Sequence, residues 1–374
     1  MKEETIATRQ AQQPNSSLSE EEKIAKRKLK KRLKQRKYDA RFQQAIEWRA
    51  DEQTIECARR ELQDHDQRLQ EEEGTVARTS DFQEEESQVR VRKARDFVIF
   101  SVYHPLISII QANQSSVMDK QHQTHQAREL LHNMNKGSHT EHMFNDENAL
   151  LGYTRQKFIE KAMVVVKSLE KLQQPTSTTT TQTLRDRVLS VRNILSVGCG
   201  PGNDLVGFLA FLSVHQPNHT LHRVLLMDYV MPQWKELILD PLINLLVPEF
   251  LPRIDTVVCD VRYSLKEEAN QSALAQLTAI DSETSSDMDL IIVSYLITET
   301  RGKWHVFFKD LISKVLPGTL LLLIEPNSWQ LHQFLELYGD MISYYEWLDS
   351  SRETPELQHL QGRIGPAVLM ACVK

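Results

Sequence analysis

The sequence contains few cysteines and no long apolar segment. Four cysteines occur among 374 residues, and none belongs to a CxxC pair. This usage argues against a disulfide framework and a cysteine-based zinc site, and it is typical of a reducing compartment. No apolar run approaches the length of a membrane span, and the first residues, MKEETIATRQ, lack the apolar core of a signal peptide. We therefore expect an intracellular protein, cytoplasmic or nuclear, that makes no membrane contact.

Aromatic residues are also scarce, at 7% of the chain, whereas charged residues reach 26%. Neither glycine nor proline occurs between Leu18 and Glu73, which predicts a long, solvent-exposed helix. Apolar residues are too sparse there for a clear heptad pattern, and a coiled coil is the alternative form of this helix. Residues 1–88 are thus expected to form a charged helical extension that is partly disordered.

A run of positive charge lies within this extension. Lys26–Lys37 reads KRKLKKRLKQRK and is almost entirely cationic. Such a run is typical of contact with RNA phosphates or of a nuclear import signal. The alternative is a solvated helix face that is balanced by the acidic runs 71–73 and 84–86. Because the net charge of the whole chain is −6, any contact with RNA would be local.

Residues 89–172 again show a helical pattern, now with apolar faces. One face lies between Phe97 and Ile110, where Pro105 begins or kinks a helix, and a second lies between Tyr153 and Leu169. We assign residues 89–150 to a helical segment that forms a cap or substrate region, and residues 151–374 to an α/β domain. The histidines from His122 to His142 have no cysteine or clear carboxylate partners nearby, so no metal site is expected.

Apolar runs alternate with helical patterns in the second half of the chain. Five continuous runs are expected to be strands covered on both faces: Asn193–Val197, Arg223–Val230, Asp255–Val261, Asp289–Leu296 and Thr319–Ile324. Tyr344–Leu348 and Ala367–Val373 follow without a convincing helix between them, so they must pair antiparallel. The pattern predicts a Rossmann-like α/β fold, with a seven-stranded, mostly parallel sheet that ends in an antiparallel C-terminal hairpin.

A glycine-rich turn joins the first strand to the helix after it. Gly198, Gly200 and Gly202 lie at alternate positions, where they allow a sharp bend and close approach of a ligand. The N-terminus of the next helix directs N–H groups and a positive dipole end toward the same place. This spacing, G-x-G-x-G, differs from the G-x-G-x-x-G of dinucleotide-binding proteins.

The glycine turn resembles motif I of the class I S-adenosylmethionine-dependent methyltransferases. The antiparallel hairpin supports the resemblance, because it distinguishes the methyltransferase fold from the dinucleotide-binding fold. The resemblance implies that S-adenosyl-L-methionine is the cofactor and that the glycine loop wraps its methionine end. One departure is Ser196, two residues before the first glycine, where members of the family usually carry an acid.

The resemblance also implies which residues hold the cofactor. The acid after the second strand would bind the ribose hydroxyls, and the residues after the third strand would contact adenine. Each acid has a structural alternative: Asp204 caps a helix, and Asp228 and Asp260 support turns. Cys199 would fill the glycine turn rather than act as a nucleophile. The expected cofactor-binding residues are Ser196, Gly198, Cys199, Gly200, Gly202, Asp204, Asp228, Tyr229, Asp260, Val261, Ser294 and Tyr295.

These observations favour a methyltransferase with an unidentified acceptor, which could be RNA, protein or a small molecule. No catalytic side chain is assigned, because the sulfonium of the cofactor supplies the electrophile. The end of the fourth strand lacks the Asn/Asp-Pro-Pro-aromatic motif, which disfavours adenine-N6 methylation. Ser196 keeps open a non-catalytic binding or scaffold protein of the same fold. An NAD-dependent enzyme is the third alternative.

Overall fold

The computed structural model describes residues 78–113, 120–136, 141–173, 179–250, 253–278, 287–300, 302–348 and 366–374. The chain divides into two compact units, Met1–Asp81 and Phe82–Lys374, and the second contains the whole sheet. The basic run Lys26–Lys37 and the helix or coiled coil expected around it lie outside the described residues.

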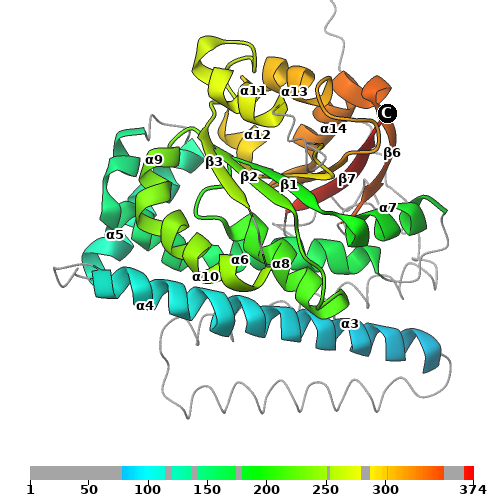
Figure 1. The fold of residues 1–374 in the computed structure, drawn as a ribbon, viewed down its shortest axis with the longest axis horizontal. Helices are drawn as coiled ribbons and strands as arrows, with labels where there is room; N and C mark the ends of the chain where they lie inside the picture. The colour runs from blue at the N-terminus through cyan, green and yellow to red at the C-terminus, as the bar shows by residue number, and fades with distance from the viewer. Residues whose placement is uncertain are drawn as a thin grey trace, which may run out of the picture. The chain divides into compact units, whose positions relative to one another are not determined.

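A seven-stranded sheet forms the centre of the second unit (Figure 1). Its strands are β1 (Asn193–Val197), β2 (Arg223–Asp228), β3 (Ile254–Val258), β4 (Leu290–Ser294), β5 (Leu320–Glu325), β6 (Ile342–Trp347) and β7 (Ala367–Val373). Their order is β3-β2-β1-β4-β5-β7-β6, and only β7 runs antiparallel to its two neighbours. The predicted α/β fold and the antiparallel hairpin are therefore confirmed.

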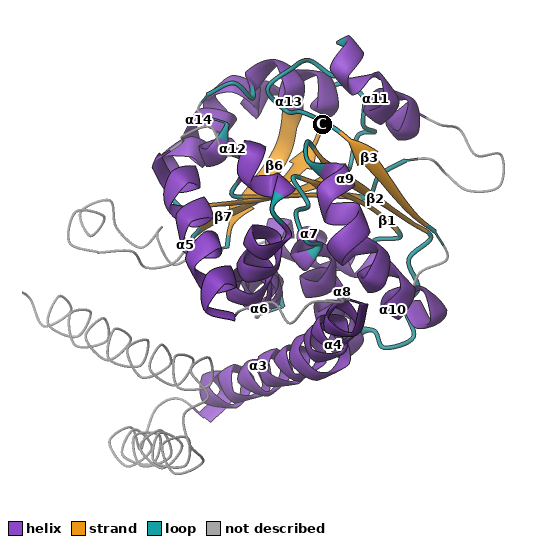
Figure 2. Ribbon diagram, turned by 90° about the vertical axis from the view of Figure 1, so that its left-hand side faces the viewer, coloured by secondary structure: helices purple, strands orange, loops and turns teal. Residues whose placement is uncertain are grey.

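Helices cover both faces of the sheet (Figure 2). On one side lie α6 (Glu147–Leu172), α8 (Asn203–His215) and α10 (Asp240–Phe250), and on the other lie α11 (Gln271–Thr278), α13 (His305–Ile312) and α14 (Ser328–Tyr338). Neighbouring residues of β1 face opposite layers: Ile194 belongs to the first apolar cluster and Leu195 to the second. Burial on both faces explains why the parallel strands read as continuous apolar runs.

Further helices complete this unit. They are α5 (Lys120–Lys136), η2 (Glu141–Asn145), α7 (Thr179–Ser190), α9 (Met231–Trp234), η3 (Lys235–Leu239), η4 (Glu268–Asn270), α12 (Leu296–Glu299) and η5 (Gly339–Met341). Of these, α12 follows β4 directly, and it positions the loop that carries Tyr295.

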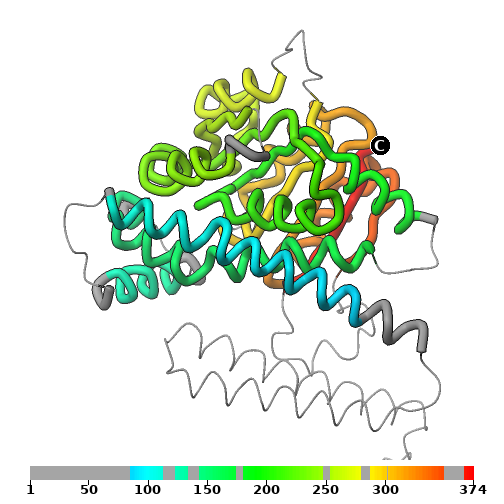
Figure 3. The backbone as a smooth tube through the Cα atoms, turned by 60° about the horizontal axis from the view of Figure 1, so that its bottom comes forward, coloured from blue at the N-terminus to red at the C-terminus, as the bar shows by residue number. Residues whose placement is uncertain are grey.

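A long helical rod leads into the sheet-containing unit and packs on its first layer (Figures 1 and 3). It consists of α3 (Arg78–Asp96), the π-helix η1 (Phe97–Tyr103) and α4 (His104–Asn113). Its buried side chains recur at every fourth residue: Ala94, Val98, Val102, Leu106 and Ile110. In an α-helix such a stripe would drift by about 40° per step. The π-helix has more residues per turn, so it reduces this rotation and keeps the row of buried side chains facing the core.

Ionic contacts also join this rod to the α/β layers. Arg90 Nε of α3 donates to Glu170 Oε1 of α6 at 2.6 Å, and His215 Nε2 of α8 lies 2.6 Å from Glu170 Oε2. Because α3 runs from Arg78 to Asp96, it passes through the boundary expected at residue 88. Across the described residues, no helix is both long and apolar enough to cross a membrane.

Candidate functional site

The three glycines of the loop after β1 all have left-handed backbone conformations. Gly198, Gly200 and Gly202 have φ angles of 68°, 50° and 83°, a region that other residues rarely adopt. The N–H groups of Gly198 and Cys199 both donate to the carbonyl of Met227, at 2.8 and 3.1 Å. The loop is thereby fixed to the end of β2, and α8 begins directly after Gly202.

The three glycines differ in what surrounds them. A Cβ built on Gly198 would lie 2.9 Å from a methyl carbon of Leu296, and one on Gly202 would lie 2.7 Å from a methyl carbon of Leu242. A Cβ on Gly200 would meet no heavy atom within 4 Å. Packing of the protein therefore requires glycine at two of the positions. At Gly200 the backbone borders open space, which a ligand can approach closely.

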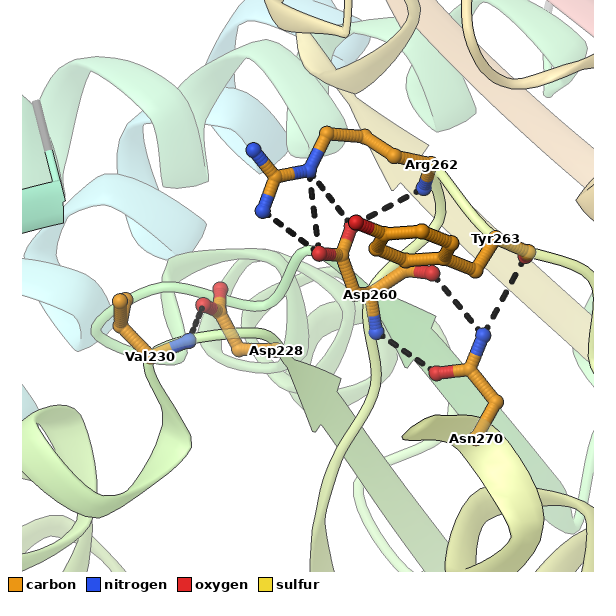
Figure 4. Close-up of polar contacts among 6 residues, drawn as sticks. All are labelled: Asp228, Val230, Asp260, Arg262, Tyr263 and Asn270. Carbon is orange, nitrogen blue, oxygen red and sulfur yellow. Dashed lines mark hydrogen bonds and ion pairs between the residues drawn. The ribbon is translucent and has the colours of Figure 1, made fainter. Parts of the chain in front are cut away.

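Asp228, at the end of β2, holds this loop through its carboxylate. Its Oδ2 accepts from the N–H of Gly200 at 3.0 Å. Its Oδ1 accepts from the N–H of Val230 at 3.0 Å, the contact drawn in Figure 4. Burial raises the pKa of Asp228, although these N–H groups oppose the shift. A carboxylate offers about four acceptor positions. Because the N–H of Tyr229 is a third donor to this carboxylate, the side chain supports the turn and retains capacity for one ligand hydroxyl.

Asp204, in the first turn of α8, lies between β1 and β4. Its Oδ1 accepts from Ser294 Oγ at 2.9 Å and from Asn203 Nδ2 at 2.8 Å, and Ser196 Oγ lies 3.4 Å from Oδ2. These partners are side chains, whereas a helix cap would bind the exposed N–H groups of the first turn. Burial raises the pKa of Asp204 to about 6, with Lys161 acting in the opposite direction.

Lys161 of α6 extends toward the same place. Its Nζ lies 4.7 Å from the centroid of the Tyr295 ring and 5.4 Å from that of Tyr153. Burial acts to lower the pKa of Lys161, but Tyr153, Glu299 and Asp204 outweigh it, so the pKa is raised above the ordinary value. The ammonium group therefore stays charged at neutral pH.

The backbone of Tyr295 is strained. Its φ of 63° is the one positive value of a non-glycine residue in the described ranges. Its N–H donates to the carbonyl of Ile324 at 2.6 Å. Glu325 then fixes α12, because its carboxylate accepts from the N–H groups of Ile297 and Thr298 at 2.8 and 3.1 Å. Polar contacts thus hold Tyr295 at the end of β4 in a conformation of high energy.

A second group of residues lies at the ends of β2 and β3 (Figure 4). Arg262 Nε lies 2.8 and 3.0 Å from the two carboxylate oxygens of Asp260, and the Arg262 guanidinium carbon lies 5.3 Å from the Tyr229 ring. Asn270 Oδ1 accepts from the N–H of Asp260 at 2.8 Å. The Asp260 carboxylate is therefore already paired, and an adenine ring would have to use the neighbouring main chain or share the carboxylate with Arg262.

The remaining expected residues, Cys199 and Val261, are both buried. Cys199 is buried, and burial, with Asp228 and Asp204 nearby, raises the pKa of its thiol well above the ordinary value. Such a thiol stays protonated at neutral pH, as expected of a residue that fills the turn. Val261 is also buried and has no polar group in its side chain. Only its main chain can form hydrogen bonds with a ligand.

The structure therefore brings the expected residues together in two groups. Ser196, Asp204, Ser294 and Tyr295 gather at β1 and β4, whereas Asp228, Tyr229 and Asp260 lie at β2 and β3, with the glycine loop attached to Asp228. The sequence analysis missed Lys161, and it counted Tyr153, whose side chain is hydrogen bonded to Lys161, only as part of an apolar face. Their spacing of eight residues, about two helical turns, was the available signal, because it places both side chains on one side of α6.

Two further observations concern possible ligands. Within the described ranges, no three His, Cys, Asp or Glu side chains are grouped in a way that could hold a metal ion. A surface pocket of about 360 Å³ is lined by residues of α4, η3 and α10, including Ile109, Glu236 and Asp240. None of the expected cofactor residues lines it.

Comparison with known proteins gave no matching family model and no matching curated sequence. Solved structures do match. The C-terminal domain of precorrin-6Y C5,15-methyltransferase from Rhodobacter capsulatus is 14% identical over 54% of this chain and 92% of its own, with a TM-score of 0.32. A TDP-rhamnose 3'-O-methyltransferase of calicheamicin biosynthesis is 18% identical over 68% of this chain and 96% of its own, with a TM-score of 0.34.

The N-methyltransferase NodS from Bradyrhizobium japonicum, solved with S-adenosyl-L-homocysteine, is 16% identical over 56% of this chain and 98% of its own, with a TM-score of 0.28. Similarities at this level carry no weight for the activity of this chain. The strand order, the antiparallel β7 and the glycine loop after β1 give this chain the fold of the class I methyltransferases.

Proposed function

We propose that this protein is an S-adenosylmethionine-dependent methyltransferase. The observation that carries the proposal is the glycine loop, whose backbone borders open space at Gly200 and is fixed by the Asp228 carboxylate. This loop lies at the carboxyl end of a parallel sheet, where ligands of open α/β folds bind. When bound, the cofactor supplies an electrophilic methyl group to a nucleophile on the acceptor.

The residues of the chain would contribute binding and orientation. Asp228 accepts a hydrogen bond from a ribose hydroxyl with the acceptor position that Gly200, Val230 and Tyr229 leave unused. Main-chain groups at Asp260 and Val261 face adenine. Ser294 and Tyr295, at the end of β4, border the place where methyl transfer occurs. Holding the acceptor in line with the methyl group is the main task of such a site, so no general base is assigned.

A non-catalytic module of the same fold is the second candidate. Two observations favour it: a serine stands at position 196, and Arg262 already pairs with Asp260. Both features would weaken a cofactor site or alter its geometry. An NAD-dependent enzyme has less support, because the glycine spacing and the antiparallel β7 differ from the dinucleotide-binding pattern.

Transfer of labelled methyl groups tests activity without knowledge of the acceptor. The purified protein would be incubated with tritiated S-adenosylmethionine and separate pools of RNA, protein and small molecules from cells. An active enzyme labels one pool, and a Gly200→Val variant does not. If the protein binds the cofactor tightly but labels none of the pools, the non-catalytic module is favoured.

We further propose that Lys26–Lys37 contacts RNA, on the basis of its charge density. Phosphate contacts release counterions, so this binding should weaken steeply as salt rises. A variant with these cations replaced by glutamine should lose the salt-dependent part of RNA binding. If both proteins bind RNA equally but only the variant fails to accumulate in the nucleus, the run is an import signal instead.

A further inference from the structure

We infer that Lys161 and Asp204 recognise the α-amino-acid end of the cofactor. Lys161 would bind the carboxylate, and Asp204 would bind the ammonium group through the Ser294 hydroxyl. This inference rests on the proposed function and assigns residues to one end of its ligand. The two side chains come from α6 and α8, and they carry the opposite charges that a zwitterion requires.

Asp204 can accept more hydrogen bonds than the protein supplies. Two donors reach Oδ1, at 2.9 and 2.8 Å, whereas Oδ2 has one distant contact, Ser196 Oγ at 3.4 Å. The Ser294 hydroxyl gives its proton to Asp204, so its lone pairs remain available to a ligand. Ser294 is 7% exposed and Asp204 is 1% exposed. An ammonium group would therefore meet the hydroxyl first, with the negative charge directly behind it.

The position of Asp204 compensates for the serine at residue 196. Proteins that resemble this chain usually carry an acid there, at the end of the first strand. In this chain the Ser196 hydroxyl contacts Asp204 Oδ2, so a carboxylate from α8 reaches the same place. The negative charge is thus supplied from a different element, and the site retains it.

Lys161 supplies the complementary cation. Its ammonium faces the rings of Tyr295 and Tyr153, and Asp204 and Glu299 act on it electrostatically. Within the described residues it forms no direct ion pair, in contrast to Lys157 one turn earlier, which binds Glu160 at 2.8 Å. An ammonium group has three donors, and Lys161 uses one of them in a hydrogen bond to the side chain of Tyr153. Two donors therefore remain for the carboxylate of a ligand.

The alternative is a purely structural role, in which Lys161 only balances the negative charge of Asp204 and does not contact the ligand. Three ligands that carry both, one or neither of the charged groups of the amino-acid end separate the two roles. S-adenosylhomocysteine carries both groups, 5'-methylthioadenosine lacks the whole amino-acid end, and decarboxylated S-adenosylmethionine keeps the amine alone. Calorimetric affinities for these three probes would be measured on the full chain and its variants.

We expect Lys161→Met and Asp204→Asn each to weaken S-adenosylhomocysteine binding about tenfold or more, because each removes a charge-assisted contact. Binding of 5'-methylthioadenosine should stay unchanged in both. Decarboxylated S-adenosylmethionine should be weakened by Asp204→Asn but not by Lys161→Met. Lys157→Met is the matched control, since it removes a lysine from the same helix, and it should leave all three affinities unchanged.

Restoring the acid at residue 196 provides a second test. Ser196→Asp in the Asp204→Asn background should recover part of the preference for S-adenosylhomocysteine over 5'-methylthioadenosine. Equal weakening of both ligands by Lys161→Met and Asp204→Asn would overturn the inference in favour of a structural role. Unchanged affinities would overturn it as well. If the unaltered protein bound none of the three probes, the proposed function itself would fail.

Discussion

The backbone N–H of Gly200 donates to Oδ2 of Asp228 at 3.0 Å. This bond links the turn after β1 to the end of β2, two segments that are adjacent in the sheet but separated by the whole of α8. The other oxygen of the same carboxylate binds Val230. A single side chain therefore sets the geometry of the glycine loop and lies where the ribose of the proposed cofactor would bind.

Replacing Asp228 with alanine is expected to weaken S-adenosylmethionine binding by about tenfold or more, because charge-assisted hydrogen bonds contribute roughly 1.5–3 kcal/mol. The variant should also lose some stability, since Gly200 and Val230 lose their acceptor. Calorimetry measures the affinity, and thermal unfolding measures the stability.

Asp289 provides the matched control for this substitution. Its Oδ2 accepts from the N–H groups of Arg192 and Asn193 at 2.7 and 2.8 Å, at the opposite end of β1. Asp289→Ala should therefore lower the unfolding temperature without changing cofactor affinity. Equal effects of the two alanine variants on affinity would rule out a specific ribose contact.

Gly200 and Gly302 form a second matched pair. Both have positive φ, at 50° and 79°, and a Cβ on either would meet no heavy atom within 4 Å. Alanine at either position should lower the free energy of unfolding by about 1–2 kcal/mol, because its side chain strains a backbone with positive φ. Only Gly200→Ala should also weaken cofactor binding. Thermal unfolding and calorimetry on the two variants check this, and equal affinities would show that the loop does not contact the ligand.

The raised pKa of Glu325 predicts that the stability of the protein depends on pH. Burial raises its pKa from 4.5 to about 7, although Thr298 and the N–H of Ile297 oppose the shift. The folded state then holds a proton that the unfolded state releases between these values, so this group makes stability fall as pH rises from 4.5 to 7. The contribution is at most about 3–4 kcal/mol, from about 1.4 kcal/mol for each pH unit between the two pKa values.

Glu325→Gln removes this titration. Relative to the unaltered protein, the variant should gain stability as pH rises from 5 to about 8. Chemical unfolding of both proteins at several pH values measures the difference. A difference that stays constant across this range would show that Glu325 has an ordinary pKa, and that α12 is held equally well at each pH.

The contact between Arg90 and Glu170 predicts that α3 belongs to the fold. Glu170 has a side-chain exposure of 5%, so Arg90→Ala would leave a buried carboxylate with His215 as its remaining partner. We expect a loss of about 2 kcal/mol in the free energy of unfolding. Lys93→Ala, on an exposed part of the same helix, should have little effect. A chain that begins at Arg78 should keep its stability, whereas one that begins at residue 89 should lose part of it.

The sequence predicted the sheet well, because parallel strands buried on both faces leave continuous apolar runs. The strand β7 was predicted with its observed bounds, Ala367–Val373. Three predicted strands extend too far at their carboxyl ends, since Val230 and Val261 are apolar but lie in turns, and Leu296 is apolar but begins α12. Two of these, Val230 and Val261, are buried without pairing in the sheet. An apolar residue indicates that its position is buried, but it does not indicate where the strand stops pairing with its neighbours in the sheet.

The strand β6 was placed two residues late for a related reason. It is the edge strand, and burial alternates along Ile342–Trp347, so it lacks the continuous signal of the central strands. The sequence identified the glycine loop and the acids after the strands. It could not show that Lys161 approaches Asp204 or that Glu325 fixes α12, because these contacts join residues far apart in the chain.

Titration of the full chain with S-adenosylhomocysteine and with NAD tests the proposed function most directly. Calorimetry should show binding of S-adenosylhomocysteine at a single site and no binding of NAD, and Asp228→Ala should weaken that binding about tenfold. Binding of NAD, or of neither compound to a folded protein, would contradict the account.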